Sequence, residues 1–155
     1  MPAIVSIAYS PTHLPAEPDD YYQRVPVTEA ALVVEHGIQG DRKGGNPNRQ
    51  LNIMSAEELA PLAAAGFKIR PGQMGEQIVI SGLDLGPLEP GARVQLGETA
   101  CIEVVSHRTG CERFEHIQGH PPTEAAGRLG VMAKVVTAGP IAVGDPVRLL
   151  TAETA

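Results

Sequence analysis

The side chains with the clearest chemical potential gather around Cys111, which follows Gly110 after an apolar run. Arg108 and Arg113 lie within three residues of the cysteine, and His107 lies one residue further away. The thiolate is the form of cysteine that attacks electrophiles and binds soft metals, and neighbouring cations favour it. Most single cysteines are small buried hydrophobes, but the glycine and the flanking charges argue against a core position. We therefore interpret Cys111 as a reactive or metal-ligating thiol.

A second group of candidates lies in glycine-rich loops. Residues 37–42 and 43–49 contain Arg42 and Arg49, whose guanidinium groups can donate forked hydrogen bonds to a phosphate or carboxylate. Glycines in these loops let the backbone approach a bound anion. The simpler alternative is a solvated loop in which Asp41 pairs with one of the arginines. The segment has neither the Lys-Ser/Thr ending of a P-loop nor the following helix of a dinucleotide fingerprint.

Polar residues also stand at or inside predicted strands. Residues 71–78 contain Glu76 and Gln77, a pair that can donate to and accept from a heterocycle, although an ordinary strand start is the simpler interpretation. Gln50 directly precedes another apolar run. Lys134 interrupts an otherwise apolar strand, and such a lysine usually reaches outward from the edge of a sheet.

The histidines near the cysteine leave a metal site open as an alternative. His107, Cys111, His116 and His120 follow one another at short spacings, and histidine and cysteine are common zinc ligands. Against zinc, Cys111 would be the only thiolate of the site. A zinc-binding module, or a module that binds a small anion without chemistry, therefore stays an alternative. Cys101 lies inside an alternating apolar run and is interpreted as an inert strand residue.

The composition limits the classes of function. The 155 residues fit one domain, residues 1–155, with 43% hydrophobic residues and a core expected over about residues 4–149. A net charge of −6 without a run of Lys or Arg argues against nucleic acid as a partner, and an aromatic content of 3% offers no stacking platform for bases. No apolar stretch approaches membrane-spanning length and no signal-peptide pattern is present, so we expect a cytoplasmic protein without a membrane partner.

Glycine and proline divide the chain into short segments. Alternating apolar and polar residues predict eight strands, and many short strands with few helices are typical of a β-barrel or sandwich. The predicted strands are residues 3–9, 25–35, 50–54, 76–81, 93–96, 100–106, 131–137 and 146–150.

Helical signals are few. A capping-box pattern begins at Ser55, and Pro61 is expected to kink or split the helix that follows. Residues 112–118 and 122–128 can each form a short helix. Residues 10–24 are predicted to form a long surface loop, and residues 151–155 a frayed tail.

Taken in order, these motifs resemble the MOSC domain, the module named after the C-terminus of molybdenum-cofactor sulfurase. The resemblance covers roughly residues 4–149, and it depends on the order of the motifs more than on any one of them. The motifs are the Gly-Asp-Arg loop at 40–42, the Arg-Gln pair at 49–50, the Gly-Glu pair at 75–76, the lone cysteine at 111 and the closing Gly-Asp at 144–145.

The resemblance implies a mainly β fold, a MOSC-type β-barrel with a few short helices. It describes a short, stand-alone member without the aminotransferase-like, pyridoxal phosphate-associated domain or the ferredoxin-like domain found with this module elsewhere. It also implies binding of the molybdenum cofactor, molybdopterin. In amidoxime-reducing members, the cysteine is a molybdenum ligand and the substrates are N-hydroxylated small molecules. A separate reductase is then expected as a partner, because the chain has no flavin or iron–sulfur motif.

Carried over residue by residue, the resemblance makes Cys111 the metal ligand and catalytic residue, or alternatively a sulfur carrier. It implies that basic and polar side chains surround the cofactor, namely Arg42, Arg49, Arg108, Asp41, Gln50, Glu76, Gln77 and Lys134. A soft thiolate suits molybdenum. Arginines in glycine-rich loops supply local positive charge even in an acidic protein.

The chain departs from the family pattern at Gly110, where proline is frequent, and at Gln77, where asparagine is frequent. Glycine loosens the cysteine loop, and glutamine reaches one methylene further. These departures keep a second hypothesis open: a non-catalytic carrier that holds a persulfide on Cys111 for cofactor or metal–sulfur cluster assembly. Its partner would be a sulfur donor, whereas the reductase hypothesis requires a small-molecule substrate. The oligomeric state is left open by the sequence.

Overall fold

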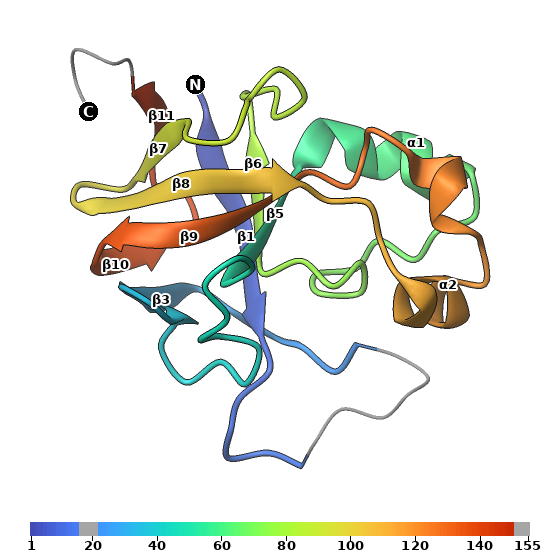
Figure 1. Ribbon diagram of the computed structural model, residues 1–155, viewed down its shortest axis with the longest axis horizontal. Coiled ribbons are helices and arrows are strands. Elements are labelled where there is room, and N and C mark those ends of the chain that lie inside the picture. Colours follow the sequence, from blue (N-terminus) through green and yellow to red (C-terminus); the bar gives the residue numbers. More distant parts are fainter. Residues whose placement is uncertain (16–21, 151–155) are drawn as a thin grey trace.

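The computed structural model describes residues 1–15 and 22–150, which form two sheets with short helices at one end (Figure 1). The larger sheet has, in spatial order, β11 (Val147–Leu150), β7 (Arg93–Leu96), β8 (Ala100–His107), β9 (Val131–Thr137), β5 (Leu51–Ser55), β6 (Ile78–Ser81), β1 (Ala3–Tyr9) and β2 (Val25–Val27). Its neighbouring strands are antiparallel, except that β5 and β6 are parallel. The smaller sheet contains β10 (Gly139–Ala142), β3 (Glu29–Val33) and β4 (Gly37–Ile38).

The core follows from the alternation of side chains along the strands. In β9, Val131, Ala133 and Val135 are buried, whereas the residues between them are partly exposed. These side chains join Ile7 and Leu51 in one apolar cluster that the strands enclose. Each fully buried Leu or Ile contributes about 1.5–3 kcal/mol. The period of two therefore fixes which face of each strand turns inward.

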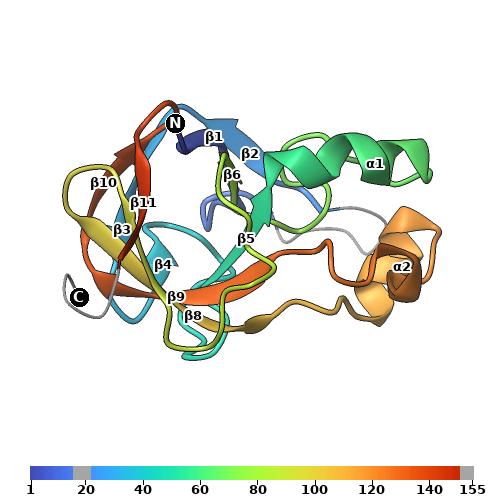
Figure 2. The ribbon, with the colours of Figure 1, turned by 90° about the horizontal axis from the view of Figure 1, so that it is seen from above.

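The larger sheet curls around this core without closing into a continuous barrel (Figure 2). An isolated bridge joins Ala3 to Pro146, just before β11. The amide of Ile4 donates to the carbonyl of Asp145 at 2.9 Å, and the amide of Val147 donates to that of Pro2 at 3.0 Å. The expectation of a mainly β fold with a few short helices is confirmed, while the strand ladder is interrupted at this seam.

The helical elements pack at one end of the larger sheet (Figure 1). They are the 3-10 turn η1 (Ala56–Glu58), α1 (Leu59–Ala64), α2 (Glu112–Gln118) and the 3-10 turn η2 (Pro122–Ala125). A second apolar cluster lies among them and includes Leu62, Phe67 and Phe114, with the last two ring centroids 5.9 Å apart. This cluster fixes α2 at the end of the sheet where β8 leads into Cys111.

Several predicted elements coincide with the structure. The bounds of β1, β7, β9 and α2 are those predicted from the sequence. The predicted strand 25–35 is instead divided, because β2 pairs with β1 and β3 pairs with β10 and β4 in the other sheet. Two strands were not predicted, since β4 has only two residues and β10 begins at a glycine that suggested a turn.

The helix after β5 differs in detail from its prediction. Ser55 makes no side-chain cap, and its hydroxyl donates instead to the carbonyl of Leu83 at 3.2 Å. Pro61 lies in the first turn of α1, where its missing N–H costs little. The expected break takes the form of a change from η1 to α1 before the proline.

The predicted surface loop at 10–24 is partly buried at both ends. Ser10 is 2% exposed and Tyr22 is 8% exposed. The middle of this loop, and the tail predicted to fray, lie outside the described residues. In the described part of the chain, no helix has the length and apolar character needed to cross a membrane.

Candidate functional site

A cavity of about 550 Å³ lies where loops from several strands approach the start of α2. Six cationic side chains line it, which is half of the twelve Lys and Arg residues in the sequence. They are Arg24, Arg42, Lys43, Arg49, Arg108 and Arg113. Among the described side chains, which do not include that of Glu112, no Asp or Glu lines the cavity. Such a recess attracts anions, even though the whole chain carries a net charge of −6.

Cys111 lines this cavity and is exposed. It is the N-cap of α2 and has an extended backbone, with φ −149° and ψ −179°. Gly110 before it has φ +80°, a conformation that proline cannot adopt. A Cβ at Gly110 would lie 2.8 Å from the Cβ of Pro122. The glycine that departs from the family pattern is therefore required by the path of this loop.

Arg108 is a partly buried cation that lines the same cavity as Cys111. One of its terminal nitrogens, Nη2, donates to the carbonyl of Met74 at 2.5 Å, and the guanidinium carbon lies 5.5 Å from the ring centroid of Phe114. The other nitrogen, Nη1, is buried without a hydrogen-bond partner in the described structure. Burial lowers the pKa of Arg108, and the negative charges that Tyr22 and Glu76 can carry oppose that lowering. Arg108 therefore has one unpaired hydrogen-bond donor, Nη1, on a side chain that lines the cavity.

The turn before β6 explains why Gly75, Glu76 and Gln77 occur together. Gly75 has φ +81°, and a Cβ there would lie 2.7 Å from Nη2 of Arg108, so only glycine lets the arginine approach. Glu76 lies outside the cavity wall and accepts hydrogen bonds from the amides of Gly72 (2.8 Å) and Met74 (3.1 Å). Burial raises its pKa, against the effect of those hydrogen bonds.

Gln77 lines the cavity and connects its two sides. Its Oε1 accepts from the amide of Asn52 at 2.7 Å, and its Nε2 donates to Asp41 at 3.2 Å. Asp41 is 1% exposed and also accepts from the amides of Ser10 (3.2 Å) and Lys43 (3.1 Å). Asp41 thus anchors the loop and orients Gln77, but it does not line the cavity.

The two predicted arginines of this loop are used differently. Arg42 lines the cavity, but its guanidinium donates to the carbonyls of Thr12, Leu14 and Pro15. Arg42 therefore adds positive charge to the cavity, while its N–H groups bind the backbone of residues 12–15. Arg49 is exposed at the cavity, and its backbone amide donates to the carbonyl of Asn46 at 3.2 Å. Among the described residues, its guanidinium group has no hydrogen-bond partner. Arg49 is therefore available to an anionic ligand.

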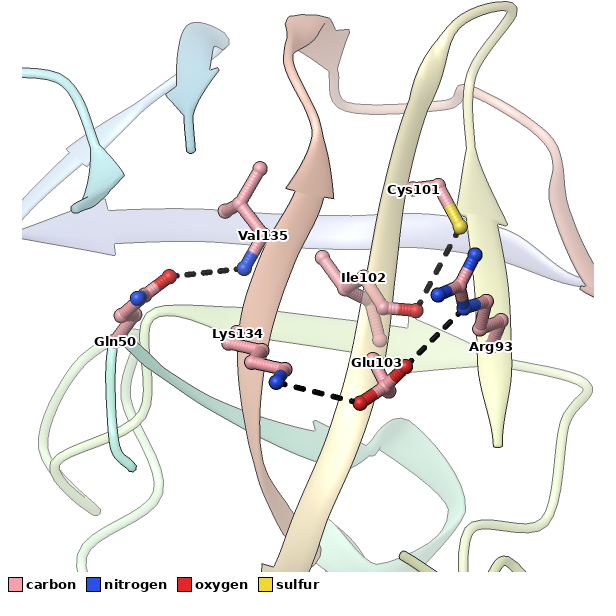
Figure 3. Close-up of polar contacts among 7 residues, drawn as sticks. All are labelled: Gln50, Arg93, Cys101, Ile102, Glu103, Lys134 and Val135. Carbon is pink, nitrogen blue, oxygen red and sulfur yellow. Dashed lines mark hydrogen bonds and ion pairs between the residues drawn. The ribbon is translucent and has the colours of Figure 1, made fainter. Parts of the chain in front are cut away.

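Gln50 and Lys134 do not line the cavity. Figure 3 shows their contacts with residues of the larger sheet. Oε1 of Gln50 accepts from the amide of Val135 at 2.9 Å and so extends the pairing of β5 with β9. Nζ of Lys134 lies 3.5 Å from Oε2 of Glu103, whose other oxygen accepts from Arg93. Both predicted site residues thus support the sheet.

The same region contains the other cysteine. Cys101 is 7% exposed, and burial raises the pKa of its thiol. Its Sγ lies 3.7 Å from the carbonyl of Ile102 (Figure 3). This burial agrees with the interpretation of Cys101 as a strand residue.

The histidines of the zinc alternative point to separate partners. His107 contacts the carbonyl of Leu88 at 2.7 Å, and His120 contacts Glu124 at 2.9 Å. Among residues 1–15 and 22–150, leaving aside the side chain of Glu112, no three His, Cys, Asp or Glu side chains are arranged to hold a metal ion.

The sequence interpretation missed several cavity residues. Tyr22 lies between two arginines, with the guanidinium carbons of Arg24 and Arg113 at 5.2 and 4.9 Å from its ring centroid. Neither Tyr22 nor Arg24 has a local signal, because both lie within the predicted surface loop, residues 10–24. Asn52 did have one, since it is a polar residue within the apolar strand β5.

Comparisons with known proteins agree with this architecture. The family model of the MOSC domain matches residues 40–148. YiiM from Geobacillus stearothermophilus has a similar structure, with a TM-score of 0.73 and 20% identity over 97% of this chain and 76% of that chain. The YuaD protein from Bacillus subtilis gives 0.73 and 21% over 95% and 94%, and YiiM from Escherichia coli gives 0.70 and 20% over 96% and 70%. No curated protein matches the sequence. Because the matched residues make up more than half of this chain, the chain belongs to the MOSC domain family.

Proposed function

We propose that this MOSC-domain protein binds the molybdenum cofactor in the cationic cavity, with Cys111 as the metal ligand, and reduces N-hydroxylated small molecules. The observation that carries the proposal is the exposed thiol in a cavity lined by six cations and by no described acid. Molybdenum accepts a soft thiolate, and an anionic pterin cofactor requires localised positive charge.

The described residues fit such a group. The volume of about 550 Å³ lies within the range of small-molecule sites. Arg49 and Arg113 line the cavity and can hold a phosphate, and the unpaired Nη1 of Arg108 can donate to a bound acceptor. Gln77 offers a fixed amide whose orientation is set by Asp41.

If bound, the cofactor would supply the redox and oxygen-transfer chemistry, and Cys111 and the cavity arginines would hold it. Conversion of N–OH to N–H releases water and consumes two electrons and two protons. The electrons come from a separate reductase, in line with the lack of a flavin or iron–sulfur motif in the sequence.

Tyr22 is the proposed proton-holding residue of the cavity. Burial raises the pKa of its phenol, although the charges of Arg108, Arg113 and Arg24 oppose that rise. Since the raised pKa lies above the ordinary value of 10.0, the hydroxyl keeps its proton at neutral pH. The phenol can then donate a hydrogen bond, or a proton, to a group bound beside Cys111.

Exposure of Cys111 also supports a second candidate function, a sulfur carrier with a persulfide on this residue. An exposed thiolate can attack the sulfur of a donor persulfide, which transfers its outer sulfur atom and leaves as a thiolate. In that case the purified protein would gain the mass of one sulfur atom at Cys111 and would contain no pterin.

The experiment that tests the main proposal is co-expression with a supply of cofactor, followed by molybdenum and pterin analysis. We expect near-stoichiometric amounts of both in the wild-type protein and in Cys101→Ser, the matched control. Cys111→Ser should lose bound molybdenum and the reduction of an N-hydroxylated substrate. Full activity of Cys111→Ser would show that this cysteine is not the metal ligand.

A further inference from the structure

We infer that the cavity recognises the lactam edge of a heterocycle, an N–H next to a C=O, through Asn52 and Arg108. This inference rests on the proposed function and specifies the ligand of the same cavity. It begins with two side-chain atoms, Oδ1 of Asn52 and Nη1 of Arg108. They are the two buried side-chain polar atoms in the described structure that have no hydrogen-bond partner.

Both atoms belong to side chains that line the cavity. Their other ends are tied to consecutive carbonyls of one turn. Nδ2 of Asn52 donates to the carbonyl of Gly75 at 3.1 Å, and Nη2 of Arg108 donates to the carbonyl of Met74 at 2.5 Å. The same turn therefore anchors the two side chains that carry the unpaired acceptor, Oδ1 of Asn52, and the unpaired donor, Nη1 of Arg108.

An unpaired buried donor or acceptor is costly, and native proteins leave few of them without a role. A ligand that satisfies both atoms must offer a donor to Asn52 and an acceptor to Arg108. A lactam carries these groups on one rigid edge. A phosphate or carboxylate alone serves Arg108 but offers no donor to Asn52 at neutral pH.

Binding involves a small movement of the wall. Each unpaired atom has less than 1 Å² of accessible surface, so the side chains that carry them must shift before a ligand can reach them. Gly72 and Gly75, both at positive φ, lie in the turn to which these side chains are anchored. The surrounding cations then bind an anionic group attached to the heterocycle.

Two sources share this chemistry, a pterin and a purine or pyrimidine substrate, and four probes separate them. Inosine 5′-monophosphate presents a lactam edge, and purine riboside 5′-monophosphate has the same size and phosphate without the ring N–H. Pterin-6-carboxylate carries a pterin lactam. Pyrophosphate is an anion alone. Calorimetry measures their dissociation constants for the wild-type protein, Asn52→Leu, and Asn48→Leu, a matched change at an exposed residue outside the cavity.

We expect Asn52→Leu to weaken at least one lactam probe by about tenfold, the loss that follows from one unpaired buried group. It should leave purine riboside 5′-monophosphate and pyrophosphate within about twofold, and Asn48→Leu should change none of the four. The affected probe identifies the source as cofactor-like or substrate-like. Wild-type protein provides a test without any variant if the purine is the source, because inosine 5′-monophosphate should then bind more tightly than purine riboside 5′-monophosphate.

The possible failures are distinct. If pyrophosphate binds but both lactam probes bind Asn52→Leu as they bind the wild type, the lactam inference is wrong and the anion site stands. If no probe binds the wild-type protein, pyrophosphate included, the cationic cavity is not a ligand site and the proposed function fails with it.

Discussion

Replacing Gly110 with alanine should destabilise the protein more than the same change at Gly127. The two glycines have nearly the same backbone conformation, with φ +80° and +79°. They differ in their surroundings. A Cβ at Gly110 would lie 2.8 Å from the Cβ of Pro122 and 3.4 Å from Leu129, whereas a Cβ at Gly127 would meet nothing within 4 Å.

The magnitude follows from these two terms. Placing alanine in the left-handed region costs about 1–2 kcal/mol at either position. The Gly110 variant adds the cost of overpacking against Pro122, about 1–3 kcal/mol, because the ring is rigid and begins η2. The smaller entropy of the unfolded chain applies to both variants and cancels in their difference. Gly110→Ala should therefore lose about 1–3 kcal/mol more than Gly127→Ala.

Urea unfolding followed by circular dichroism measures this difference. For a chain of this length, each kcal/mol also lowers Tm by about 2–4 °C. Agreement of the two variants within about 0.5 kcal/mol would refute the steric argument for Gly110. The departure from proline at this position would then rest on the positive φ of Gly110 alone.

The remaining predictions concern residues outside the cavity wall. For Glu76, a folded pKa raised above 4.5 means that the native state keeps the carboxyl proton to higher pH than the unfolded state does. The contribution of Glu76 to the free energy of unfolding therefore falls as pH rises above 4.5. The unfolding free energy of the wild type relative to Glu76→Gln should therefore increase as pH is lowered from 7 toward 4.5, and a pH-independent difference would contradict the burial argument. Gln50→Ala should cost about 1–3 kcal/mol in urea unfolding, because the amide of Val135 loses its acceptor. Lys134→Ala breaks a partly exposed ion pair with Glu103, so it should lower the free energy of unfolding by less than about 1 kcal/mol and leave pyrophosphate binding unchanged. Weaker pyrophosphate binding by this variant would show that Lys134 contributes to the ligand site.

The sequence was most informative where a local pattern has one structural meaning. The bounds of β1 and β9 followed from alternation, and residues 112–118, predicted as a short helix, form α2. Cys111 and Arg108 were predicted to lie together because they are neighbours in the chain, and both line the cavity.

Other parts required the third dimension. Asp41 and Gln50 are polar residues in the expected motifs, but their side chains satisfy backbone amides, and a carboxylate or amide type does not reveal which partner it has. Tyr22 reaches the cavity across a large sequence separation from Arg108, and its local sequence resembles a surface loop. The unpaired atom of Asn52 depends on the turn at Gly75, which no local pattern encodes.

Anomalous diffraction at the molybdenum edge, on crystals of protein co-expressed with a cofactor supply, tests the central claim most directly. The account predicts one molybdenum peak at bonding distance from Sγ of Cys111, with the anionic part of the ligand against the arginines of the cavity. Molybdenum bound elsewhere, or a fully ligand-free cavity in protein that contains molybdenum, would contradict it.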